Sequence, residues 1–184
     1  MHADAPTNGE ADLLATPRIV RMVRRAWEAL GASGVPFLLD DRAGGWLALA
    51  DPDQVDQVIW GLLDNAVKYG GGTPITVTVE LASGDGGTLR LRVADAGPGL
   101  AEADRGRLFE RYARGSLPSA DGTGLGLYVS RELARANGGE LVLEQPEAGL
   151  GDPRAGDAAA SAGSAHPAGA TFILTLPAES PTEG

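Results

Sequence analysis

The segment Asp64-Asn65-Ala66-Val67-Lys68-Tyr69 puts a candidate metal ligand and a cation on one predicted helix. Asn65 offers a neutral amide oxygen, a hard ligand that suits Mg²⁺ when phosphates and waters supply the remaining ligands. Lys68, one turn further on, would reach a phosphate as a point charge, and Tyr69 would close over a bound nucleotide. An ordinary solvated helix face would show the same residues, so this segment alone leaves both interpretations open.

A second segment, Asp95-Ala96-Gly97-Pro98-Gly99, ends a predicted strand in a carboxylate. A carboxylate in that place can accept a hydrogen bond from the exocyclic amine of adenine. Gly97 and Gly99 have no side chain, so the backbone there can lie close to a planar ring. Asp and Gly are also common turn residues, and a simple turn is the alternative interpretation.

A third segment, Gly122-Thr123-Gly124-Leu125-Gly126-Leu127, opens an apolar helix that we predict over residues 123–136. Free backbone N–H groups at a helix N-terminus attract phosphate, so residues 122–126 are a candidate phosphate-binding turn. No Gly-Lys-Ser/Thr follows, which excludes a Walker loop. The glycine spacing of a dinucleotide-binding turn is also missing. A flexible hinge before a helix is the alternative.

Patterns of apolar residues predict the elements that would hold these segments in place. Residues 52–69 form a helix that Asp51 caps and a run of three glycines ends, with one stripe to bury and another free for a ligand. The full set is helices over 17–30, 52–69 and 123–136, and strands over 35–39, 46–50, 75–81, 89–94, 140–144 and 170–176. This layout predicts an α+β fold, a two-layer sandwich with helices on one face of a mixed, mostly antiparallel sheet.

The chain length of 184 residues predicts one domain. We expect a flexible tail over residues 1–15, the domain over 16–177 and a second tail over 178–184. Residues 145–169 are mostly Ala, Gly and Pro, and we predict a disordered insertion there.

Composition excludes several classes of site and partner. The chain has no cysteine, so it holds neither disulfides nor thiolate metal sites. A net charge of -10 argues against a nucleic-acid partner. No apolar run approaches the roughly 20 residues of a membrane helix, and the N-terminus has no signal-peptide pattern. We therefore expect a cytoplasmic location and no membrane contact by this chain.

Together, in this order, the three segments resemble the catalytic and ATP-binding domain of sensor histidine kinases, within the GHKL ATPase superfamily and its Bergerat fold. The resemblance runs from about residue 50 to residue 137, with a final strand near Thr171. It implies ATP as the substrate, Mg²⁺ held by Asn65, adenine read by Asp95, and phosphates held by Lys68 and the 122–126 backbone.

A further segment, Leu108-Phe109-Glu110-Arg111-Tyr112, resembles the phenylalanine-containing box of the lid that covers ATP in histidine kinases. By that resemblance Phe109 would anchor the lid, and Arg111 and Arg114 would be the lid cations that touch phosphates. Core packing of Phe109 is compatible with this role. A contribution of the two arginines to solubility alone is the alternative.

The chain departs from the family pattern at two positions. Gly61 stands where histidine kinases usually carry an asparagine and where ATP-hydrolysing relatives carry a glutamate general base, so we expect slow hydrolysis. Asn137-Gly138-Gly139 replaces the commoner His-Gly-Gly, a change that we interpret as minor.

The resemblance also implies partners. The chain has two histidines, His2 and His166, and neither lies in the sequence context of a phosphoacceptor. The acceptor histidine is therefore expected on a separate dimerisation segment, with a response regulator downstream and with the domain on the cytoplasmic side of a membrane-bound sensor. A serine kinase of the anti-sigma-factor type and a non-catalytic ATP-sensing module are the alternatives.

Overall fold

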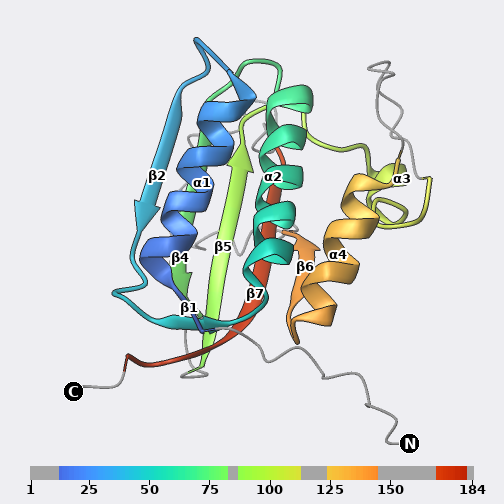
Figure 1. The fold of residues 1–184 in the computed structure, drawn as a ribbon. Coiled ribbons are helices and arrows are strands. Elements are labelled where there is room, and N and C mark those ends of the chain that lie inside the picture. The colour runs from blue at the N-terminus through green and yellow to red at the C-terminus, as the bar shows by residue number, and fades with distance from the viewer. Residues whose placement is uncertain (1–12, 83–86, 113–123, 145–168, 182–184) are drawn as a thin grey trace, which may run out of the picture.

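The computed structural model describes residues 13–82, 87–112, 124–144 and 169–181 (Figure 1). The predicted insertion lies outside them except for Gly169, as do both histidines, Arg114, Gly122 and Thr123. No helix in the described ranges is long and apolar enough to cross a membrane.

A mixed sheet forms one layer of the molecule. Its strands are β1 (Leu13–Ala15), β2 (Phe37–Asp41), β3 (Leu47–Leu49), β4 (Ile75–Leu81), β5 (Thr88–Asp95), β6 (Glu140–Leu143) and β7 (Thr171–Glu179). They follow the order β1-β3-β7-β5-β4-β2, and β6 also pairs with β7. Only the β2–β4 pair is parallel among the described strands. The sheet is therefore mostly antiparallel, as predicted.

Three helices cover one face of this sheet: α1 (Thr16–Leu30), α2 (Pro52–Tyr69) and α4 (Gly126–Ala136). α2 lies between the other two and contacts both. The short α3 (Glu102–Arg105) lies outside this layer, near the start of α4 (Figure 1). Side chains from the helices and from the facing side of the strands fill one core, including Val23, Leu62, Leu63, Val77, Leu91 and Leu174. The α+β fold class is confirmed.

α2 forms where the sequence predicts it because both of its ends carry local signals. The Asp51 side chain accepts hydrogen bonds from the backbone N–H groups of Asp53 and Gln54, and Pro52 occupies the first turn. Gly70 ends the helix. The stripe that it buries is Val55, Val58, Ile59, Leu62, Leu63 and Ala66.

Several bounds differ from the predicted ones: β2 covers residues 37–41 instead of 35–39, and α4 begins at Gly126 instead of residue 123. Two further differences arise because a strand pairs with a distant segment. Residues 13–15 belong to β1 and pair with β3, whereas the sequence predicts a tail through residue 15. β7 continues to Glu179 because its last residues pair with Leu47 and Ala48 of β3.

Candidate nucleotide-binding site

Three predicted segments meet at one end of the molecule. The C-terminal end of α2, the end of β5 and the N-terminal end of α4 lie together at the upper end in Figure 1. The sheet carries β5 upward beneath α2, and α4 packs beside α2. The fold therefore brings the candidate metal, base and phosphate segments to the same region.

Asn65 and its neighbours lie on the last turns of α2. Asn65 is partly exposed, and none of the described residues forms a hydrogen bond with its side chain. Lys68 is exposed and donates a hydrogen bond to Asp64 at 2.6 Å. Tyr69 is also exposed. The amide oxygen of Asn65 is therefore available to a ligand, whereas Lys68 would have to share its charge between Asp64 and a phosphate.

Thr73 joins the end of α2 to the end of β5. Its hydroxyl donates to the Gly70 carbonyl at 2.7 Å and accepts from the Ala96 N–H at 3.2 Å. A Cβ built on Gly97 would lie 2.8 Å from Gly70 Cα, a contact that no side chain tolerates. The backbones of the two segments thus touch, and this fixes the position of Asp95 relative to α2.

Asp95 uses one carboxylate oxygen inside the protein. Its Oδ1 accepts hydrogen bonds from the N–H groups of Gly97 at 2.9 Å and Ala170 at 3.3 Å. Gly169 approaches so closely that a Cβ there would lie 2.1 Å from the Asp95 carbonyl oxygen. Oδ2 has no hydrogen bond to any described residue. The carboxylate is therefore oriented by the backbone and keeps one free acceptor.

The two glycines after Asp95 fit closely against the chain itself. Gly97 touches Gly70, and a Cβ on Gly99 would lie 3.1 Å from the Gly169 carbonyl oxygen. Gly99 also has a φ of +74°, which favours glycine. These contacts account for glycine at both positions without a bound ligand. That the backbone of Gly97 and Gly99 lies close to an adenine ring stays a prediction.

The α4 N-terminus provides the candidate phosphate contacts. Gly124 and Leu125 lead directly into the helix, which begins at Gly126 and has no side-chain cap. Gly126 is exposed, and among the described residues none would lie within 4 Å of a Cβ built on it. No described side chain caps the first N–H groups of α4, which is what anion binding at a helix N-terminus requires.

Phe109 packs on the domain core. Its ring meets Phe172 of β7 edge to face, with 6.5 Å between the ring centroids. The Arg131 guanidinium of α4 lies over the Phe109 ring, 4.8 Å from its centroid. The loop that carries Phe109 is thereby attached to both β7 and α4.

Arg111 lies between two aromatic rings. Its guanidinium carbon is 5.7 Å from the Tyr112 ring centroid and 5.6 Å from that of Tyr128 on α4. Tyr112 has a positive φ of 63°. Arg111 thus holds the loop near the start of α4, on the side where phosphates would lie.

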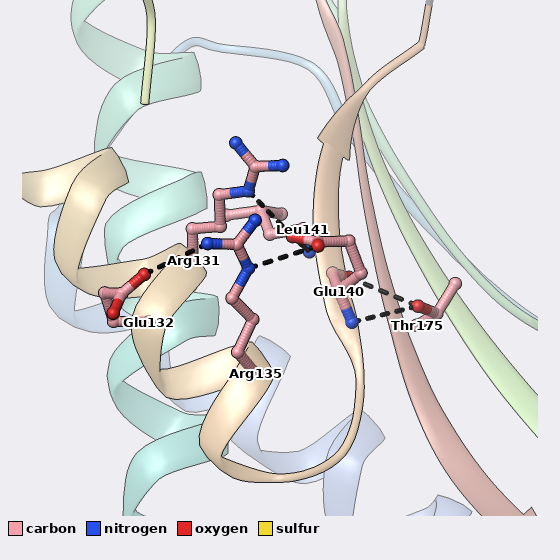
Figure 2. A network of polar contacts seen from close by, with 6 residues as sticks. All are labelled: Arg131, Glu132, Arg135, Glu140, Leu141 and Thr175. Atoms are coloured by element: carbon pink, nitrogen blue, oxygen red, sulfur yellow. Dashed lines mark hydrogen bonds and ion pairs between the residues drawn. The ribbon is translucent and has the colours of Figure 1, made fainter. Parts of the chain in front are cut away.

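Glu140 anchors α4 to the sheet (Figure 2). Its carboxylate accepts hydrogen bonds from Arg131 at 2.8 Å and Arg135 at 3.2 Å, both on α4. Its backbone N–H donates to the Thr175 hydroxyl, and that hydroxyl donates to the Glu140 carbonyl. Burial raises the pKa of Glu140, but the hydrogen bonds from Arg131, the Leu141 N–H and Arg135 outweigh this effect, and the net pKa is lowered.

Asn137 links the C-terminal end of α4 to the N-terminal end of α2. Its Oδ1 accepts from the Asp51 N–H at 2.7 Å, and its Nδ2 donates to Gln54 at 3.0 Å and to the Leu133 carbonyl at 2.7 Å. The sequence interpretation of this position as a minor replacement missed the link. The only sequence signal for this link is a polar amide at the end of a helix, and such a signal does not predict which distant residue the amide contacts.

Gly61 lies where α2 crosses α4. A Cβ at this position would lie 3.0 Å from the Ser130 hydroxyl oxygen, and Ser130 is buried. The absence of a side chain at position 61 therefore matches a close approach of the two helices, which the sequence does not reveal.

The donor set fits a magnesium ion held mainly by its nucleotide. The described residues contain no group of three His, Cys, Asp or Glu side chains that could hold a metal by themselves. A single amide oxygen with phosphate and water ligands is the arrangement that Mg²⁺ accepts. Asn65 meets that requirement because its side chain has no partner in the described part of the chain.

Comparison with known proteins supports this picture. The family described as histidine kinase-, DNA gyrase B-, and HSP90-like ATPase matches residues 50–180. The signal transduction histidine-protein kinase AfsQ2 of Streptomyces coelicolor is 38% identical over 112 residues, which are 59% of this chain and 20% of AfsQ2. The histidine-protein kinase/phosphatase MprB of a Mycobacterium species is 30% identical over 172 residues, 92% of this chain and 30% of MprB.

A solved structure gives the same fold. The mycobacterial sensor histidine kinase MprB superposes with a TM-score of 0.69 at 24% identity, covering 91% of this chain and 99% of that one. By sequence, the chain spans only 20% and 30% of the length of the two relatives above.

Proposed function

Because the chain belongs to the histidine kinase-, DNA gyrase B-, and HSP90-like ATPase family, we propose that it is the ATP-binding catalytic domain of a sensor histidine kinase. Asp95 carries the proposal: its Oδ1 is held by two backbone N–H groups while Oδ2 remains free. A fixed carboxylate with one free oxygen suits the exocyclic amine of adenine, whereas the carbonyl of guanine would meet it with repulsion.

The remaining site residues would bind the rest of the nucleotide. Asn65 would hold Mg²⁺, which neutralises phosphate charge when bound. The N–H groups at Gly124–Gly126, together with Gly122, Thr123 and Lys68, would hold the phosphates. Phe109 and Tyr69 would cover the nucleotide, and Arg111 and Arg114 would add positive charge from the loop.

The reaction that we propose is phosphoryl transfer to a histidine on a separate dimerisation segment. The imidazole nitrogen forms a bond to the γ-phosphorus while the bond to the bridging oxygen breaks, and ADP leaves. Such transfer needs positioning and charge neutralisation more than covalent help from this domain. A response regulator would receive the phosphoryl group next, and the domain would act on the cytoplasmic side of its sensor.

Transfer to a purified partner tests this proposal. The chain alone, incubated with γ-labelled ATP and Mg²⁺, is expected to bind ATP without labelling itself. Addition of the dimerisation segment of its cognate kinase should give a labelled product that is labile in acid and stable in alkali, as an N–P bond is. Phosphoserine on another partner would support the serine-kinase alternative instead. No transfer despite ATP binding would contradict the proposal and favour an ATP-sensing module.

A further inference from the structure

One face of α1 carries a cluster of exposed arginines. Arg18, Arg21 and Arg25 follow an i, i+3, i+7 spacing, and Arg24 lies beside them. The opposite face of the helix is buried against the core. All four guanidinium groups therefore project from the outer side of the helix layer. We call this set the arginine face.

Most of this positive charge has no partner in the part of the chain that the structure describes. Arg25 pairs with Asp56 of α2 at 2.7 Å. Among the described residues, Arg18, Arg21 and Arg24 form neither an ion pair nor a contact with an aromatic ring. Every other described lysine and arginine forms an ion pair or contacts an aromatic ring. In a chain with a net charge of -10, the unpaired cations of the described residues thus gather on a single helix.

The arginine face borders a shallow cavity of about 510 Å³ between α1 and the first turns of α2. Met22, which belongs to the buried face of α1, lies at its base, and Glu28 and Asp53 contribute carboxylates. The N-terminal halves of α1 and α2 lie at the lower end in Figure 1, opposite the candidate nucleotide site. Asp53 and Asn65 are separated by roughly 18 Å along α2, at 1.5 Å per residue, so the two sites do not overlap.

We propose that the arginine face docks an acidic segment of a partner protein. Guanidinium groups bind carboxylates through paired hydrogen bonds, and carboxylates at helical spacing would meet Arg18, Arg21 and Arg24 together. Three like charges at these spacings repel one another along α1, and an acidic partner removes that repulsion.

The mixed character of the surface favours a protein over a uniform polyanion. Glu28 and Asp53 would repel a nucleic acid or an anionic bilayer that covered the whole cavity. A protein segment can instead place carboxylates at the arginines and basic or neutral groups at the acids. Arginine is also enriched in protein interfaces relative to the remaining surface.

A designed helical peptide with glutamates at i, i+3 and i+7 serves as the probe, and the same peptide with glutamines is its control. Fluorescence anisotropy with the full 184-residue chain should show binding of the glutamate peptide only. Because the contact is between exposed charges, its affinity should fall steadily as NaCl rises from about 50 to 300 mM.

Two charge-matched double variants locate the contact. Arg21→Glu with Arg24→Glu should weaken peptide binding by about tenfold or more. Arg42→Glu with Arg107→Glu, which reverses equal charge elsewhere, should change it by less than about twofold. Melting curves and ATP affinity should match the unmodified chain in the first variant, which separates a lost contact from lost folding.

Three outcomes would overturn the proposal. One is no binding of the glutamate peptide at low salt. Another is an equal loss of binding in both double variants. The third is tighter binding of phosphatidylserine vesicles or duplex DNA than of the peptide, with the same dependence on Arg21 and Arg24.

Discussion

Asp95 uses one of its two carboxylate oxygens within the fold and leaves the other free of described partners. Oδ1 satisfies N–H groups of the following turn and of the segment before β7, so the side chain has one orientation. Oδ2 stays free and faces no described donor. Asn65 differs, because no described residue holds its amide, and a bound ion would have to orient it.

Asn65→Ala should therefore remove the Mg²⁺-dependent part of ATP binding. Alanine is the better helix former, so α2 should remain intact. Calorimetric titrations of ATP with Mg²⁺ and with EDTA measure the difference directly. Gln57→Ala, an exposed amide on the same helix, is the matched control. If Mg²⁺ still raises the ATP affinity of the Asn65 variant as much as that of the control, Asn65 is not the metal ligand.

Among the helices and strands, α4 needs a fixed position, because its N-terminus would bind the phosphates. Arg131 binds Glu140 of β6 and also covers Phe109, so a single side chain connects the helix, the sheet and the loop. Asn137 attaches the other end of α4 to the start of α2.

Glu140→Gln should lower the melting temperature in a manner that depends on pH. The folded-state pKa of Glu140 is lowered, so its stabilising contribution is present above the ordinary glutamate pKa of about 4.3 and is lost as pH falls through the folded value. Exposed ion pairs contribute about 0.5–1 kcal/mol, which is roughly 1–4 °C here.

Melting curves from pH 7 to pH 3 test this dependence. The difference between the unmodified chain and the variant should be constant near neutrality and should shrink below about pH 4.3. Glu110→Gln, at the exposed Arg107 pair, controls for a general loss of negative charge. A difference that stays the same down to pH 3 would show that the carboxylate charge of Glu140 does not stabilise α4.

Gly61→Asn introduces the residue that is usual in the family, but it should destabilise the domain and should not restore a function. Its side chain would enter the space of the Ser130 hydroxyl, and overpacking of this kind costs about 1–3 kcal/mol. Adding Ser130→Ala should recover part of the loss, because the two positions share one contact. Urea unfolding of both single variants and of the double variant gives the coupling. Strictly additive losses would mean that the helices do not meet through these residues.

Across the whole molecule, sequence patterns predict the local features better than the pairing. The bounds of α2 and the β4–β5 hairpin follow from caps, glycines and alternation within short stretches. β1 carries too little local pattern to be predicted. The strand at β3 is predicted, but its pattern does not reveal its partner, because β3 pairs with the distant end of β7. β2 pairs in parallel with β4, a contact that requires a crossover through α2.

In the candidate site, too, local motifs are predictable from the sequence and distant contacts are not. Asn65, Asp95 and the start of α4 are recognisable from short motifs, and the fold brings them to one end of the molecule. The residues that hold those motifs, Thr73, Arg131 and Asn137, act through partners that are remote in sequence or belong to another element. Spacing along the chain does not report such contacts.

Residues 146–168, between β6 and β7, should be dispensable for the fold and for ATP binding. Glu144 and Thr171 already lie together, since the Glu144 N–H donates to the Thr171 carbonyl at 2.8 Å. A short Gly-Ser turn in place of residues 146–168 can therefore join the two strands, and loop entropy changes slowly with length. Melting temperature and ATP affinity should be unchanged within error. A large fall in either would show that the segment contributes to the domain.

If Asp95 reads adenine, the ATP affinity of Asp95→Asn should show it. The variant keeps the shape of the side chain but loses its charge, so isothermal titration should show a loss of about 1–3 kcal/mol, roughly 5- to 150-fold in Kd. Discrimination between ATP and GTP should fall at the same time. Asp40→Asn, on the remote strand β2, should leave both quantities unchanged. Unchanged ATP affinity and unchanged discrimination in a folded Asp95→Asn variant would remove Asp95 from the site and contradict the account.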